Sequence, residues 1–167
     1  MNFNKLVNTL LETAQPTMHV DEDGTIRWKI DGILHKEDGP AVIYPNGTTV
    51  WYVDGVKHRE DGPAMVSTSR DVSAWYKHGE LHREEGPAVV YKDGSFEWYI
   101  DGYRHKLDGP AVVHMHDGKI KSEDWWINGE QITGSDLENH KEKIKFRNTL
   151  AQKNDNLFDK NFIEELD

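Results

Sequence analysis

The chain has 167 residues and no cysteine, with six Trp, six Tyr and five Phe at a mean hydropathy of −0.80. The lack of cysteine excludes disulfides and thiolate chemistry, and the aromatic content favours a folded domain over a disordered chain. The formal charge of −10 argues against direct binding of nucleic acid through its phosphates.

Residues 1–16 carry apolar side chains at helical spacing. These are Phe3, Leu6, Val7, Leu10, Leu11 and Ala14, and Pro16 ends the pattern. We therefore expect an N-terminal amphipathic helix, which is too polar for a signal-peptide core. Since no stretch approaches the length of a membrane span, we expect a cytoplasmic protein without membrane contact.

Residues 17–133 are organised as a repeat array. One phrase occurs four times: GILHKEDGPAV at 32–42, GVKHREDGPAM at 55–65, GELHREEGPAV at 79–89 and GYRHKLDGPAV at 102–112. The tryptophans follow steps of 23 to 27 residues: Trp28, Trp51, Trp75, Trp98 and Trp125. We divide the array into units 31–53, 54–77, 78–100 and 101–127, with partial units at both ends.

Each unit is predicted to be a pair of short strands around a tight turn. Asp54-Gly55, His78-Gly79 and Asn128-Gly129 separate runs rich in β-branched and aromatic residues, which is the typical signal of a two-residue hairpin. The expected fold class is mainly β: an elongated antiparallel β-meander of 23-residue hairpin repeats, with roughly 14 short strands and with N- and C-terminal helices.

The tight turns also predict a register. Pairing about Asp54-Gly55 places Trp51 opposite His58, and the same arithmetic pairs Trp28 with His35, Trp75 with His82, Trp98 with His105 and Trp125 with Ile132. A second two-residue turn at Asn46-Gly47 would place Val42 beside Trp51. Asp93-Gly94 likewise places Val89 beside Trp98, whereas the second unit lacks Asn-Gly and is expected to use a three-residue loop, Ser69-Arg70-Asp71, that sets Met65 beside Trp75. Each Trp is then expected between a His and an aliphatic side chain, with Ala41 and Val50 on the opposite face.

Residues 134–167 form the C-terminal helical segment. The letters SDLE at 135–138 match a capping box, which predicts a helix to about Gln152. A second short amphipathic piece is expected around Leu157, Phe158, Phe162, Ile163 and Leu166. We expect both chain ends to cap or cover the sheet, and a homodimer contact is the alternative.

The period and the phrases WYVDGVKH and YPNG resemble MORN repeats, which are β-hairpins stacked into an elongated twisted sheet. Gly32 to His35 and Gly55 to His58 keep the Gly-x-x-His spacing of that family, but the continuation His-Arg-Glu-Asp-Gly-Pro-Ala replaces its usual His-Gly-x-Gly. The array looks like a divergent variant found in bacterial and large-virus proteins, some of them antitoxin-like. The resemblance implies a scaffold, a dimerisation platform or a lipid-contacting surface.

The repeated His-x-x-acid pattern could suggest acid–base catalysis or a ladder of metal ligands. The pairs are His35/Asp38, His58/Asp61, His82/Glu85 and His105/Asp108. Catalysis needs one pocket, whereas four near-copies along an open sheet indicate a structural joint. His114 and His116 should share a strand face as a partial metal site, but no third ligand is evident. We therefore expect no catalytic residue, no metal and no cofactor.

Positions at which the units differ are the best candidates for contact with a partner, because structural positions repeat. The units differ at 77–80 and at 114–126. With the Trp/His row, these give the candidate binding residues Trp51, His58, Trp75, His78, Glu80, His82, Trp98, His105, His114, His116, Trp125 and Trp126.

The favoured hypothesis is a non-enzymatic protein-interaction module, such as a small phage or bacterial regulator or inhibitor that binds a target protein through its repeat sheet. One alternative is a protein that sequesters a ligand or nucleotide on a Trp/His-lined surface. Another is an acidic DNA mimic, which requires acids gathered on one face. The Lys and Arg residues interleaved with those acids count against the mimic.

Overall fold

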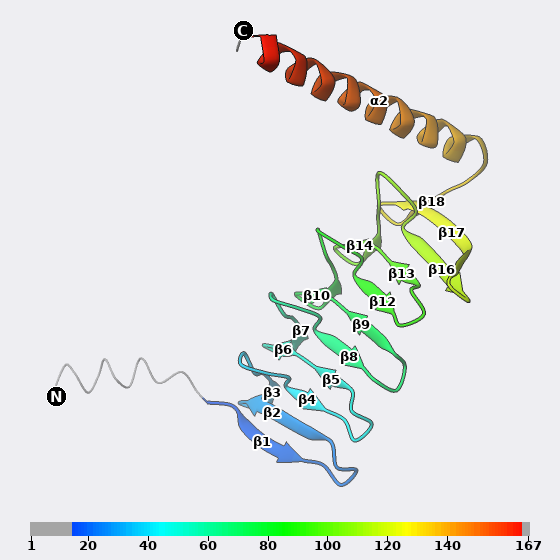
Figure 1. Ribbon diagram of the computed structural model, residues 1–167. Coiled ribbons are helices and arrows are strands. Elements are labelled where there is room, and N and C mark those ends of the chain that lie inside the picture. Colours follow the sequence, from blue (N-terminus) through cyan, green and yellow to red (C-terminus); the bar gives the residue numbers. More distant parts are fainter. Residues whose placement is uncertain (1–14, 165–167) are drawn as a thin grey trace, which may run out of the picture.

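The computed structural model describes the backbone of residues 15–164, and the side chains as far as Gln152. The protein is mainly β, with a large antiparallel β-meander followed by one C-terminal helix, α2 (Gly134–Glu164) (Figure 1). The helix expected within residues 1–16 falls almost wholly on residues outside the described part.

Twelve strands form the main sheet, and every pairing is antiparallel. They are β1 (Thr17–Val20), β2 (Ile26–Ile30), β3 (Ile33–Leu34), β4 (Val42–Ile43), β5 (Thr49–Val50), β8 (Met65–Ser67), β9 (Val72–Ala74), β12 (Val89–Tyr91), β13 (Phe96–Glu97), β16 (Val112–His116), β17 (Lys119–Ile127) and β18 (Glu130–Ile132). Neighbours in this sheet follow chain order, with β3 paired to β2 at the side, so successive units are added along one direction.

The remaining strands lie in three separate two-stranded hairpins, so the strands do not all pair in one sheet. The hairpins are β6 (Tyr52–Val53) with β7 (Val56–Lys57), β10 (Tyr76–Lys77) with β11 (Glu80–Leu81), and β14 (Tyr99–Ile100) with β15 (Tyr103–Arg104). The chain changes partner at each Trp. The Trp51 N–H donates to the carbonyl of Ala64 at 2.7 Å, whereas the Trp51 carbonyl accepts from the His58 N–H at 3.3 Å.

The tight turns of these hairpins are as predicted. Both turn residues have positive φ, with 49° at Asp54 and 80° at Gly55, as a two-residue type I′ turn requires. The backbone N–H of His58 bonds to Trp51, and the equivalent bond recurs at His35, His82 and His105. Trp125 faces Ile132. The predicted register of Trp and His is therefore confirmed.

The predicted register at the other turn is wrong by one residue. Tyr44 and Thr48 close a three-residue loop in which only Gly47 has positive φ, so Val42 lies opposite Val50 and not beside Trp51. Met65 pairs likewise with Ala74, and Val89 with Glu97. Because side chains alternate faces along a strand, this shift moves the aliphatic residues away from the Trp face.

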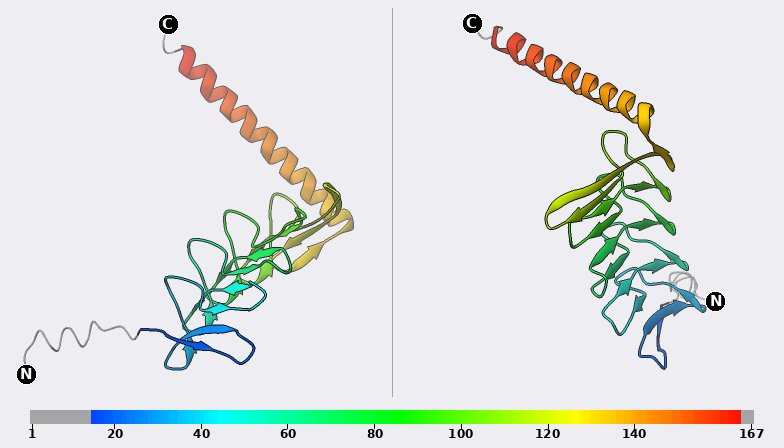
Figure 2. Two further views of the ribbon diagram at one scale, coloured as in Figure 1. Left: turned by 60° about the horizontal axis from the view of Figure 1, so that its bottom comes forward. Right: turned by 90° about the vertical axis from the view of Figure 1, so that its right-hand side faces the viewer.

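Backbone hydrogen bonds stack the small hairpins on one another. Gly55 donates to the carbonyl of Leu34 at 2.8 Å, and Lys36 donates to that of Tyr52 at 3.0 Å. Equivalent pairs of bonds join each later hairpin to the one before it. The hairpins thus form a second row beside the main sheet (Figure 2).

The core is made of small side chains. The fully buried corner residues are Ala41, Ala64, Ala88 and Ala111, and the buried strand residues include Val42, Val50, Val72, Val89, Val112 and Val113. Tyr76, Leu81 and Tyr99 from the hairpin row pack against Val72, Ala74 and Val89. The hairpins therefore cover one face of the sheet, which sequence reasoning had assigned to the terminal helices.

The C-terminal segment is one continuous helix, not the two pieces expected. It leaves the last unit of the array and points away from it instead of lying over the sheet (Figures 1 and 2). Within residues 134–152 only Leu137, His140 and Ile144 are half-buried. Across residues 15–164, no helix combines the length and apolar character needed to cross a membrane.

Candidate functional site

A cation stacks on the Trp at the corner of each unit. Lys36 lies over Trp28 at 4.4 Å, and Arg59 lies over Trp51 at 4.2 Å. Arg83 over Trp75 and Lys106 over Trp98 follow at 4.0 and 3.6 Å. A cation held over an indole face is attracted by the ring quadrupole. These basic side chains therefore turn inward, which leaves their charges largely covered.

The glycine of each Gly-Pro pair makes room for that cation. A Cβ at Gly86 would lie 2.8 Å from the guanidinium carbon of Arg83, and one at Gly62 would lie 3.0 Å from that of Arg59. The same crowding at Gly39 and Gly109 comes from Lys36 and Lys106. The Trp, the base and the Gly thus form one structural unit. The Ala that follows each Gly-Pro pair is fully buried.

The histidine of each repeated motif contacts the turn of the next hairpin, and we call His35, His58, His82 and His105 the joint histidines. His35 Nδ1 lies 3.2 Å from the backbone nitrogen of Asp54 and 2.9 Å from its carboxylate. His82 makes the same two contacts with Asp101, at 3.2 and 2.8 Å. With a bare Nδ1 the ring accepts from the N–H, and with a proton there it donates to the carboxylate. The joint is bonded in either state.

In two of the four joints, those of His58 and His105, the turn residue has no carboxylate. His58 Nδ1 accepts from the backbone N–H of His78 at 3.1 Å, and the two rings stack with centroids 4.7 Å apart. His105 Nδ1 accepts from the N–H of Asn128 at 3.2 Å. The imidazole rings of His35, His58, His82 and His105 therefore have a structural role, because each holds its unit against the next hairpin. Among the residues that the structure describes, no three His, Cys, Asp or Glu side chains converge as metal ligands.

The acids of the joint loops point outward. The exposed fractions of their side chains run from 72% to 86% for Glu37, Asp38, Glu60, Asp61, Glu84 and Asp108, of which Asp108 has the lowest value and Asp38 the highest. Arg59 donates to Asp61 at 2.7 Å, and this bond lowers the pKa of the Asp61 carboxyl below its usual range. Lys106 lowers the pKa of Asp108 in the same way.

Exposed apolar side chains lie at the hairpin tips. Ile33, Val56 and Tyr103 occupy the position after the turn glycine in their units and are all exposed, whereas Glu80 stands there in the third unit. Each lies against the turn glycine of the next hairpin, as Ile33 does at Gly55. We call the set Ile33, Val56, Glu80, Tyr103 and the loop acids Glu37, Glu60, Glu84 and Asp108 the hairpin edge.

The twelve candidate residues do not meet in one site. Trp51, Trp75 and Trp98 are half-buried beneath their cations, and His58, His82 and His105 are half-buried in the joints. His78 and Glu80 are exposed at one hairpin tip. His114 and His116 are exposed on β16, where the partner strand shifts register.

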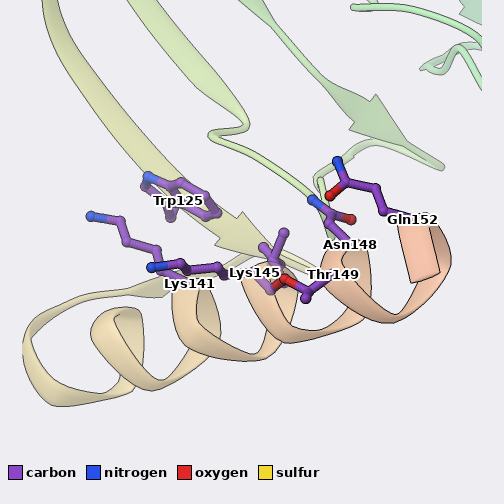
Figure 3. A pocket seen from close by; sticks show the side chains of 7 residues that line it. Trp125, Lys141, Lys145, Asn148, Thr149 and Gln152 are labelled. Atoms are coloured by element: carbon purple, nitrogen blue, oxygen red, sulfur yellow. The ribbon is translucent and has the colours of Figure 1, made fainter.

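Trp125 and Trp126 lie near the start of α2. The Trp125 ring meets the edge of His140 at 6.0 Å, and His140 Nε2 lies 2.8 Å from the carbonyl oxygen of Leu107. A hollow of about 430 Å³ separates Trp125 from α2, with Lys141, Lys145, Asn148, Thr149 and Gln152 along its helical side (Figure 3). Among the residues that line it there is no His and no acid.

A charged cluster that sequence reasoning missed lies in the fourth unit. The Glu97 carboxylate, 9% exposed, accepts from the hydroxyls of Tyr91 and Tyr99 at 3.0 and 2.9 Å and from Arg104 at 2.8 Å. Burial alone would raise the pKa of Glu97, but these hydrogen bonds outweigh it and hold the pKa below its usual range. Burial beside Glu97 raises the pKa of Tyr91 to about 12.

The cluster had one sequence signal. Glu97 directly precedes its Trp, where Val50 and Ala74 stand in the units before it. An acid at a position that is buried elsewhere in the array needs several donors, and Arg104 with the two tyrosines supplies them. Because all of its groups are paired, we regard the cluster as a structural network and not as a reactive site.

A scan against protein-family models finds no match, and a search of curated proteins finds none.

Proposed function

We propose that the protein is a non-enzymatic interaction module that binds a partner protein along the hairpin edge. The observation that carries this proposal is the sorting of charge within each joint, where bases fold inward over Trp while acids face solvent. Units built on a hairpin period of 23 or 24 residues would repeat this edge about every 10 Å, the width of two paired strands. An extended basic and partly apolar partner fits such a surface.

The resemblance to divergent MORN repeats agrees with this proposal, because such arrays act mainly as scaffolds and binding platforms. In this form the protein would be a small phage or bacterial regulator that inhibits or shields its target. The His-x-x-acid pattern counts against an enzymatic role, since each of its four histidines lies against a backbone N–H of the next hairpin through Nδ1.

A second candidate, an acidic DNA mimic that occupies a nucleic-acid-binding protein, gains support from the same sorting of charge. The Lys and Arg residues next to the acids are stacked on Trp rings. Lys36, Arg59 and Lys106 also pair with the Asp two residues on, so the outward charge left without a basic partner in these loops is mainly that of Glu37, Glu60 and Glu84. A target held in this way should be released by duplex DNA. A target that DNA cannot displace would favour the general interaction module.

The alternative of ligand or nucleotide sequestration rests on the hollow beside Trp125. Mass spectrometry of material released on denaturation would detect a retained ligand, and a protein that releases none would count against this function.

The test of the main proposal is affinity capture from cell lysate at moderate salt with three forms of the chain. The variant E37Q/E60Q/E84Q removes three charges from the hairpin edge and keeps an oxygen acceptor beside each joint. The control E22Q/E123Q/E130Q removes three exposed acids elsewhere. A stoichiometric partner should bind the wild type and the control and be lost from the edge variant. Recovery of no partner, or equal loss from both variants, would contradict the proposal.

A further inference from the structure

The hollow beside Trp125 is bounded by β17 on one side and by the first half of α2 on the other. His140 holds the two sides together, because its ring meets the edge of Trp125 at 6.0 Å and its Nε2 lies 2.8 Å from the carbonyl oxygen of Leu107. Leu107 stands where the three earlier joints carry a Glu, so the joint that contacts α2 lacks this outward acid. At about 430 Å³ the hollow has the size of a small-molecule site.

The helical side of this hollow is basic and polar. Lys141 and Lys145 lie four residues apart on one face of α2 (Figure 3). The same face continues with uncharged polar side chains, which are Asn148, Thr149 and Gln152. Lys141 pairs with Glu138 at 3.5 Å, but both side chains are exposed to solvent, so this pair holds the ammonium group only weakly. An anion in the hollow would therefore meet two ammonium groups and no carboxylate of the lining.

Two larger hollows of the described chain contain acids in their linings. One, of about 740 Å³, lies at the first unit and includes Glu37 and Asp38. The other, of about 550 Å³, lies between the last hairpin and α2 and includes Glu130 and Asp136. Of these three hollows, the one beside Trp125 is thus the best suited to an anion, although the chain carries a formal charge of −10.

Trp125 and two amide side chains offer contacts for an uncharged aromatic group. An indole face stacks on other ring systems, and nucleobases stack on aromatic side chains in this way. Among the residues that the structure describes, neither Asn148 nor Gln152 has a hydrogen-bond partner for its side chain. Each amide presents donors and an acceptor, which is the combination needed to pair with the polar edge of a base.

We propose that this hollow binds a small aromatic anion of the nucleoside monophosphate class, with its ring stacked on Trp125 and its phosphate held by Lys141 and Lys145. The inference rests on the hollow invoked above for ligand sequestration and gives that function a ligand class. It does not depend on a partner protein at the hairpin edge. Because the ligand would contact both β17 and α2, its binding would fix the helix against the last unit of the array.

Titration of the full chain with AMP, followed by the indole N–H resonances of the six tryptophans, tests where the ligand binds. The resonance of Trp125 is identified by its loss in W125F, and AMP should shift it more than the other five. Adenosine and inorganic phosphate each offer only part of the contacts. Equilibrium dialysis should show that both bind roughly tenfold or more weakly than AMP.

Variants of the two sides separate the contacts. K141Q/K145Q should raise the dissociation constant of AMP roughly tenfold or more, since it removes both charges that face the phosphate. W125L should weaken AMP to a similar extent, whereas W125F keeps an aromatic ring and should bind nearly as the wild type. The control K119Q/K121Q removes two exposed lysines of β17 that do not line this hollow, and its affinity should be unchanged.

Urea unfolding shows whether W125L is folded, and K141Q/K145Q keeps the test decisive if it is not. No shift of the Trp125 resonance with AMP overturns the proposal. Equal affinity for AMP and adenosine, equal affinity for AMP and phosphate, or equal weakening in the control also overturns it. If AMP fails to bind while mass spectrometry finds a retained ligand of another class, this proposal is refuted and ligand sequestration remains.

Discussion

Replacing Gly86 by Ala tests whether the Gly-Pro motif exists to accommodate the base stacked on Trp. The new Cβ would lie 2.8 Å from the guanidinium carbon of Arg83, so the guanidinium must shift from its position over Trp75. Gly86 is not among the glycines with positive φ, and Ala therefore brings no backbone strain. The whole cost comes from the displaced arginine.

The magnitude is set by the contacts that Arg83 loses. Its stacking on Trp75 contributes about 0.5–2 kcal/mol, and its hydrogen bond to the Pro87 carbonyl at 3.2 Å contributes about 1 kcal/mol. Replacing Gly by Ala restricts the unfolded chain and returns about 0.4–1 kcal/mol. We therefore expect the free energy of unfolding to fall by about 1 kcal/mol.

Urea unfolding monitored by Trp fluorescence measures this change in wild type and in R83A. In the R83A background the clash is absent, so G86A should become neutral or slightly stabilising. G39A offers a graded comparison, because the nearest atom there is the flexible tip of Lys36 at 3.1 Å, and its cost should be smaller. An equal cost of G86A with and without Arg83 would refute the reasoning.

Three further predictions concern the charged groups. The pKa of Glu97 is lowered in the folded state, so its stabilising contribution is present above the unfolded value near 4.5 and is lost as the pH falls through the folded value. The free energy of unfolding should therefore decrease more between pH 7 and pH 3 in the wild type than in E97Q. The pKa of Tyr91 is raised to about 12, so its contribution is complete below pH 10 and lost between about 10 and 12; spectrophotometric titration should show one phenol fewer ionising near pH 12 in Y91F. H78D places a carboxylate beside His58, as Asp54 and Asp101 do beside His35 and His82, and should raise the free energy of unfolding in a urea titration by about 0.5–1 kcal/mol above that of H78A. Equal free energies of unfolding for H78D and H78A would disprove this role of the carboxylate.

Turn chemistry explains which part of the fold was predictable. The Asp54-Gly55 and His78-Gly79 turns use positive φ at both positions, so the pairing of Trp with His could be derived from the sequence alone. Asn46-Gly47 uses the same kind of letters, but the Asn46 side chain accepts from the Thr48 N–H within a three-residue loop. The turn glycine is followed by Val56 in the first case and by Thr48 in the other, and this difference did not predict that the second loop is one residue longer.

The change of strand partner at each Trp could not be predicted from the hydrophobic periodicity, because the alternating strand pattern continues through the Trp without interruption. The partner switch depends on the fully buried Ala of the next unit, as at Trp51 and Ala64, and this contact joins residues 13 positions apart. The inward fold of Lys36 and Arg59 was missed for a similar reason. The adjacent letters Lys-Glu-Asp look mixed in charge, whereas in the structure the base lies over its Trp, pairs with the Asp two residues on, and leaves the acids facing solvent.

The helix illustrates a different limit. The SDLE letters at 135–138 located the start of α2, but the helix was predicted to end at about Gln152 with a second short amphipathic piece after it, whereas α2 continues to Glu164. Its projection away from the sheet was also not foreseen. The hairpin row already covers the face that the terminal helices were expected to cover, so α2 is left with only the last unit to contact.

The central claim is that the recurring motif builds a joint whose outward acids form the binding surface. It is tested most directly by measuring the affinity of a captured partner for the wild type, for E37Q/E60Q/E84Q and for the charge-matched control E22Q/E123Q/E130Q, with all three chains shown to be equally stable. The account predicts a loss of affinity confined to the edge variant and steepened at low salt. Equal affinity for all three chains would contradict it.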